Sequence, residues 1–138
     1  MWQKGKMRAL GTLGGEFSTA YGINNHGQIT GYAALKGDGI NHAFLFSNGK
    51  MKDIDTLNDT LSVGQAINNS GVVVGYRDAG ADNSAFIFSN GKMQDLNDLI
   101  PANSGWALQT AKGINDAGQI SGTGMFNGNQ RGFLLTPQ

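Results

Sequence analysis

The sequence predicts an all-β fold of the β-propeller type, with three four-stranded units in one chain. Blocks of sequence recur along the 138 residues at intervals of about 44 residues, a spacing typical of propeller blades. The chain also has 22 glycines and only two prolines, about twice the ordinary share of glycine. Because regular apolar segments separate the glycines, this composition indicates short strands joined by tight turns.

Two blocks define the repeat. The first contains a Gly-Ile-Asn or Ala-Ile-Asn motif and the second an Ala-Phe-Leu-Phe or Ala-Phe-Ile-Phe motif followed by Ser-Asn-Gly-Lys-Met. The first block occupies residues 22–32, 66–76 and 113–123, and the second occupies 43–51 and 85–93. The third copy of the second block is split between 132–135 and 2–10. We therefore predict a single domain, 1–138, with units 11–54, 55–96 and 97–135, the last completed by residues 1–10.

Each unit is expected to contain four strands. The first carries the Ile of the first block, the second follows the next Gly, the third is the Ala-Phe segment, and the fourth is the Lys-Met segment. Asn48-Gly49 and Asn90-Gly91 predict type I′ hairpins between the third and fourth strands, since both positions need a positive φ. Gly31, Gly75 and Gly122 fall inside strand patterns and suggest a close backbone approach between neighbouring sheets.

The turns between the first and second strands share an asparagine. Asn24, Asn68 and Asn115 each begin a short link that ends in Gly, so we expect their side chains to bond the local backbone. A role of these asparagines in ligand contact is the alternative.

The architecture follows from the number of units. Propellers have about four to eight blades, and three twisted sheets would taper too sharply to fill a circle. We expect a homodimer that forms a six-bladed ring, or a piece of a longer array. A three-fold arrangement of the β-trefoil or prism type is the alternative.

Composition excludes several classes of partner. The ten basic and ten acidic side chains cancel and form no run, so we expect no nucleic-acid partner. No window approaches about eighteen consecutive apolar residues, so we expect no membrane span. The absence of cysteine excludes disulfides and thiolate zinc sites. Residues 1–8 have no apolar core of a signal peptide, and we expect none within this chain.

The chain resembles the HAF repeat family, named for a tripeptide present here as His42-Ala43-Phe44. The segments that carry the resemblance are 22–28, 42–46, 48–51, 11–15 and 133–137. The second and third copies depart from the motif, because Ser84 and Arg131 stand where the family has His. The resemblance implies a repeat architecture and an extracellular or cell-surface location, with no settled activity.

The long connections are the expected place for a ligand. In an up-and-down sheet the second-to-third and fourth-to-first connections share one edge, and binding usually occurs on such variable loops. These connections are residues 33–41, 77–83, 124–130, 11–17, 55–61 and 97–108. Trp106, Arg77 and Arg131 are candidate ligand contacts there, and Trp106 could instead cap the core. Tyr21, Gln65 and Lys112 hold one repeated position in the first strands, which suits the wall of a central channel.

Catalytic signatures are weak. His42 with Asp38 or Asp78 is a candidate general base, but the sequence contains no nucleophile elbow, metalloprotease helix motif, P-loop or dinucleotide fingerprint. We therefore expect no cofactor and no metal. The preferred hypothesis is a binding module that presents a variable-loop face to a small ligand such as a glycan. The alternatives are a hydrolase at the channel mouth and a purely structural repeat.

Overall fold

The computed structural model describes residues 4–37 and 39–138, and these residues form eleven strands and one short 3₁₀ helix. The first sheet contains β1 (Gly14–Ile23), β2 (Ile29–Leu35), β3 (Asn41–Ser47) and β4 (Lys50–Asp53) in that order. The second contains β5 (Ser62–Ile67), β6 (Val73–Asp78), β7 (Asn83–Ser89) and β8 (Lys92–Asp95). The helix η1 (Leu96–Leu99) follows, and the third sheet has β9 (Trp106–Ile114), β10 (Ile120–Phe126) and β11 (Asn129–Leu135).

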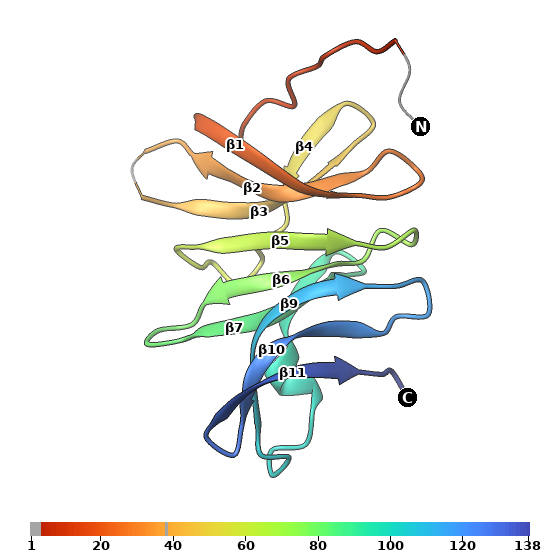
Figure 1. The fold of residues 1–138 in the computed structure, drawn as a ribbon. Coiled ribbons are helices and arrows are strands. Elements are labelled where there is room, and N and C mark those ends of the chain that lie inside the picture. Colours follow the sequence, from red (N-terminus) through yellow and green to blue (C-terminus); the bar gives the residue numbers. More distant parts are fainter. Residues whose placement is uncertain (1–3, 38) are drawn as a thin grey trace.

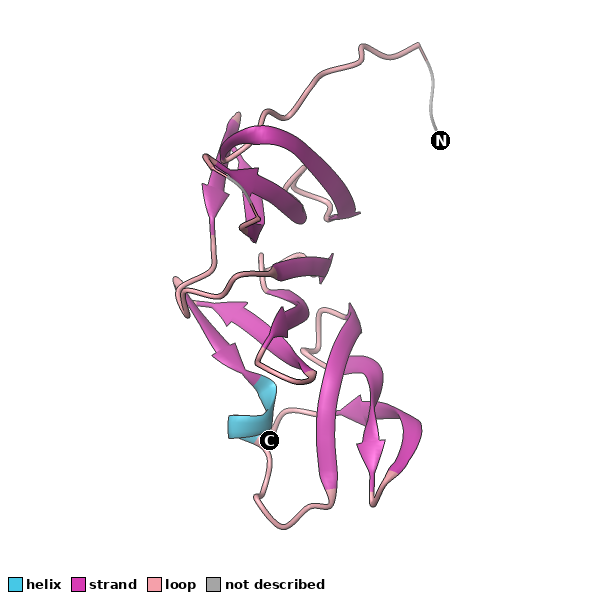
Figure 2. Cartoon of the chain, turned by 90° about the vertical axis from the view of Figure 1, so that its left-hand side faces the viewer, coloured by secondary structure: helices cyan, strands magenta, loops and turns pink. Residues whose placement is uncertain are grey.

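The three sheets form an open stack in chain order (Figure 1). All paired strands are antiparallel, and the first strand of each later sheet packs against the sheet before it. Figure 2 shows the same succession from the side, with η1 beside the last strands of the second sheet. The all-β prediction is therefore confirmed, as is the repeated strand order within the sheets.

The predicted completion of the third sheet within one chain is not found. Residues 4–10 contain no strand, and the described residues place no fourth strand beside β11. The first and third sheets lie at opposite ends of the stack (Figure 1). Residues 4–37 and 39–138 also form no closed barrel, which a β-trefoil would require. Pairing of the chain ends between two copies stays a prediction.

Apolar side chains hold the sheets together at two interfaces. Buried residues between the first and second sheets are Ala43, Ile54, Ile67, Val73, Phe86, Phe88 and Met93. Those between the second and third sheets are Val74, Ala85, Leu96, Leu108, Ala111, Ile120 and Phe133. Many members occupy equivalent repeat positions, so each interface is a variation of the same packing arrangement.

The hairpin predictions are confirmed by backbone geometry. Asn48 and Gly49 have φ of 53° and 79°, and Asn90 and Gly91 have φ of 54° and 80°. The third sheet adds a turn of the same kind between β10 and β11, because Asn127 and Gly128 have φ of 49° and 85°. The segment 124–130, expected to be a long loop, is thus mostly strand.

The repeated strand glycines admit a close approach within each sheet, not between sheets as the sequence suggested. A Cβ on Gly31 would lie 1.8 Å from the carbonyl oxygen of Thr19 in β1, and one on Gly75 would lie 1.8 Å from that of Val63 in β5. Gly122 in β10 would meet the carbonyl of Thr110 in the same way, at 2.0 Å. Glycine is therefore required at these positions, because the second strand of each sheet lies too close to the backbone of the first to leave room for a Cβ atom.

The turn asparagines form a ladder across the stack. The Asn68 Oδ1 atom accepts from the backbone N–H groups of Ser70 and Val72, as expected of a turn residue. The Asn24 Nδ2 atom also donates to the Asn68 carbonyl at 2.9 Å, and Asn68 Nδ2 donates to the Asn115 carbonyl at 3.1 Å. Each asparagine thus closes its own turn, and the first two also bind the next turn in the stack.

We predict that Asn68→Ala destabilises the chain by about 2 kcal/mol, because it removes two turn bonds and one bond between sheets at a buried position. Urea unfolding measures the change. Asn115→Ala is the matched control, since Asn115 Nδ2 donates only within its own turn, to Gln119. Equal losses from the two variants would contradict a stabilising role of the ladder.

Candidate ligand-binding site

The edge with the long connections contains a network of charged residues around His42. The His42 Nδ1 atom lies 2.7 Å from Asp53 Oδ2, and its Nε2 atom lies 2.7 Å from the carbonyl oxygen of Asp59. Both partners are acceptors, so the geometry favours the imidazolium form, in which both ring nitrogens donate. Burial would lower the pKa of His42, but the hydrogen bonds to Asp53 and Asp59 and the nearby carboxylates together raise it. A ring with both nitrogens engaged has no free atom to act as a general base.

Arg77 belongs to the same network. Its Nε and Nη2 atoms bind the two carboxylate oxygens of Asp59 at 2.8 and 2.7 Å, and its Nη1 atom binds Asp95 at 2.9 Å. The Asp55 side chain is fully buried and accepts from the Ser62 hydroxyl at 2.7 Å. The network fixes the β4–β5 connection between the first and second sheets. Arg77 therefore has its guanidinium committed to the scaffold.

Among the described residues, the other candidates of the loop edge make no hydrogen bond or ion pair with His42. Asp78 accepts from the Thr60 hydroxyl and the Gly80 N–H, and Asp38 lies outside the described residues. Arg131 is an exposed residue of β11 whose Nη1 donates to the Gln130 carbonyl. Trp106 is half-buried and packs on Phe126 and Phe133, with ring centroids 4.9 and 6.2 Å away. This packing corresponds to the alternative in which Trp106 covers the core.

Three candidates from the first strands share an unusual backbone position. In the first sheet the register shifts between Ala20 and Gly22, so Tyr21 has no partner on β2. Equivalent shifts leave Gln65 of β5 and Lys112 of β9 unpaired. Each residue is therefore the extra residue of a β-bulge, a feature that redirects a side chain and is frequent beside functional sites. The sheets repeat this device three times.

Aromatic rings surround the first of these bulges. Tyr21 is 52% exposed and stacks on Tyr32 of β2, with ring centroids 6.1 Å apart and planes 22° apart. Phe17 meets Tyr32 edge-on at 6.0 Å and is also largely exposed. Burial raises the pKa of Tyr76 on β6, and the nearby Tyr21 and Tyr32 hydroxyls raise it further. We use the name inner-strand face for this aromatic group, Phe17, Tyr21, Tyr32 and Tyr76, together with the bulge residues Gln65 and Lys112 of the other two sheets.

A family model described as "Protein of unknown function (DUF3466)" matches residues 13–135, which include all eleven strands. The chain belongs to this family. The resemblance to the HAF repeat family is thereby corrected, because the matching model is a different one. Neither the curated proteins nor the solved structures gave a match.

Sequence reasoning named part of the candidate site of this DUF3466 chain. It named Tyr21, Gln65 and Lys112, but it missed Tyr32 and Tyr76, although both follow the repeated strand glycine of the first block. It also missed Asp53 and Asp59 as the partners of His42, since no local pattern links residues so far apart in sequence.

The described residues contain neither a cluster of metal ligands nor a helix suited to a membrane. Among residues 4–37 and 39–138, no group of three or more His, Cys, Asp or Glu side chains is arranged to hold a metal ion. Within the same ranges, no helix has the length and apolar character needed to cross a lipid bilayer.

We predict that His42 makes stability depend on pH. Because its folded pKa is above the ordinary 6.5, its charge contributes stability that is fully present below pH 6.5 and is lost as pH rises through the folded pKa. Unfolding free energies of the native chain and His42→Gln, measured from about pH 5 to pH 8.5, test this. Their difference should be largest at the acidic end, and a difference that grows with pH would contradict the assignment.

Proposed function

We propose that the chain is a binding module whose inner-strand face binds a glycan without turnover. The observation that carries this proposal is the exposed, stacked pair Tyr21–Tyr32 beside Phe17. Exposed aromatic rings offer a flat apolar surface with a polar rim, which suits the apolar face of a sugar ring. Gln65 and Lys112 add hydrogen-bonding groups at equivalent bulges for the hydroxyls of such a ligand.

The loop edge is a weaker candidate for the ligand face. Its charged side chains neutralise one another, since Arg77 binds Asp59 and Asp95, and His42 binds Asp53. The same geometry disfavours the hydrolase alternative, because a saturated imidazolium is a poor proton acceptor. We therefore place the ligand on the inner-strand face, and treat an extracellular or cell-surface location as a proposal that fractionation of the source cells would test.

We also propose that two copies assemble head to tail, so that six sheets surround a channel lined by the inner-strand faces. The support is the open stack (Figure 1), whose end sheets leave single apolar side chains exposed, Ile23 on the first sheet and Leu134 on the third. In a ring of this kind the first strands lie innermost, which would bring six equivalent bulges to one channel wall.

We predict that at least one member of a panel of soluble cello-, malto- and chito-oligosaccharides raises the melting temperature of the chain. Tyr21→Ala should weaken binding of that oligosaccharide by about tenfold in calorimetry, because it removes an exposed stacking ring. Tyr21→Phe is the matched control and should retain most of the affinity. No shift with any oligosaccharide, or equal losses from both variants, would contradict the proposed site.

A parallel screen with chromogenic esters, phosphates and glycosides addresses the hydrolase alternative. We expect no turnover above that of buffer. Turnover that disappears in His42→Ala, while the variant remains folded by circular dichroism, would favour the enzyme instead.

A further inference from the structure

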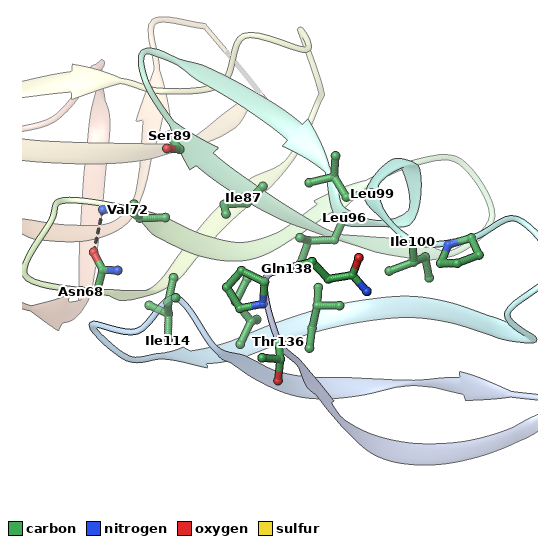
Figure 3. Close-up of a pocket in the computed structure, with 15 residues that line it drawn as sticks. Asn68, Val72, Ile87, Ser89, Leu96, Leu99, Ile100, Ile114, Thr136 and Gln138 are labelled. Carbon is green, nitrogen blue, oxygen red and sulfur yellow. Dashed lines mark hydrogen bonds between the residues drawn. The ribbon is translucent and has the colours of Figure 1, made fainter.

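An apolar hollow of about 580 Å³ lies between the second and third sheets, beside the free edge of β11 (Figure 3). Ile87 and Leu96 contribute to it from the second sheet and the segment after β8. Ile114, Ile120 and Leu135 contribute from the third sheet. Figure 3 shows the Ile114, Leu96 and Ile87 side chains converging on this space. A smaller hollow of about 190 Å³ follows the same edge and reaches Trp106 and Phe133.

The interface between the first and second sheets shows which side chain fills the equivalent space there. The positions equivalent to Leu96, Ile114, Ile120 and Leu135 are Ile54, Ile67, Val73 and Phe88. These four residues pack on Met93 of β8, which is only 2% exposed. The third sheet has no strand equivalent to β8 among the described residues, so the hollow lies where the equivalent methionine would be.

The chain contains an equivalent methionine at the opposite end of the stack. Lys6-Met7 matches Lys50-Met51 and Lys92-Met93 in the repeat, and Met7 is completely exposed. The residues after Met7 are already in place on the first sheet. The Arg8 guanidinium lies 5.6 Å from the Phe46 ring centroid, and Leu10 packs against the cluster of Phe44 and Phe46. Arg8 and Leu10 therefore contact the first sheet, while the Met7 side chain stays fully exposed to solvent.

The two end faces of the stack continue the interfaces that already exist inside the chain. Ile23 on the first sheet is 68% exposed, whereas the equivalent Ile67 is 8% exposed. Leu134 on the third sheet is also 68% exposed, whereas the equivalent Leu45 and Ile87 pack against the cores of the next interfaces. The asparagine ladder also stops at the third sheet. The Nδ2 atoms of Asn24 and Asn68 donate to the next turn of the stack, whereas that of Asn115 donates to Gln119 in its own turn. Among the described residues, the end with the third sheet therefore lacks a methionine in its hollow, and the end with the first sheet has an exposed methionine, Met7.

We infer that residues 4–9 of one chain form the fourth strand of the third sheet in a second copy, with Met7 filling that copy's hollow. The register follows from the second sheet, where Phe88 pairs with Met93 and Ile87 with Gln94. Met7 then lies opposite Leu135 of the second copy, and Arg8 lies opposite Leu134. The inference rests on the homodimer proposed above and specifies its contacts. It does not depend on the glycan.

Substitution of Met7 tests the inference without disturbing the fold of a single chain. Met7 is completely exposed in the single chain, so Met7→Ala should leave monomer unfolding unchanged while it raises the dissociation constant of the dimer at least tenfold. Dilution series followed by light scattering measure this constant. Lys6→Ala is the matched control, because the equivalent Lys50 and Lys92 are exposed, and it should change the constant less than threefold. An unchanged dissociation constant in Met7→Ala would overturn the inference. The same result is expected if a small apolar molecule, and not Met7, fills the hollow.

Cross-linking separates this contact from dimerisation itself. The chain has no cysteine, so Arg8→Cys and Leu134→Cys introduce single thiols, and antiparallel partners lie within reach of a disulfide. An oxidised mixture of the two variants should give a covalent species of twice the 14.5 kDa chain mass, while either variant alone should not. A dimer without the cross-link would overturn the donated strand and leave the homodimer standing. A monomer at all concentrations would overturn both, and would leave the glycan proposal to its own test.

Discussion

The burial of sheet faces against one another is the constraint on which the structure depends. A four-stranded twisted sheet has two faces, and in this chain each inner face becomes a core only when a neighbouring sheet covers it. The second sheet satisfies this requirement on both sides, and its Val73, Val74 and Phe86 are fully buried. Within the part of the chain that the structure describes, no neighbouring sheet covers the outer face of the third sheet, and that of the first is covered in part by Leu10 and Leu13, which pack on Phe44 and Phe46. Exposed Ile23 and Leu134 are the direct result, because a repeat that stops always leaves one unmatched face at each end.

Polar groups also join the sheets, at both edges of the stack. The asparagine ladder joins successive turns at one edge, and the network of His42, Arg77 and four aspartates joins the first two sheets at the other. A buried ion network of this kind requires each charge to have a partner, and Asp55, with its Ser62 hydrogen bond, shows how fully this is met. His42 and Arg77 are therefore bound within the scaffold by these contacts.

The bulges connect the scaffold to the proposed function. Gly31, Gly75 and Gly122 let the second strand approach the first closely, and in the first strand the residue after each glycine's partner is left without a partner of its own. The same backbone irregularity therefore presents Tyr21, Gln65 and Lys112. Because the glycines fix the backbone while the bulged residue varies, the chain keeps one architecture and offers three different side chains. Such a division suits a surface that recognises a ligand.

The sequence alone determined the β-repeat, the type I′ hairpins and the turn role of Asn24, Asn68 and Asn115, because these depend on short-range rules of backbone conformation. It also indicated that residues 2–10 complete a repeat. Only the tertiary structure decided the partners of His42, the aromatic stacking of Tyr21 on Tyr32, and the coincidence of the hollow with the place of a missing methionine. These features join residues from different strands and sheets, and the distance between such residues is set by packing, which no local pattern encodes.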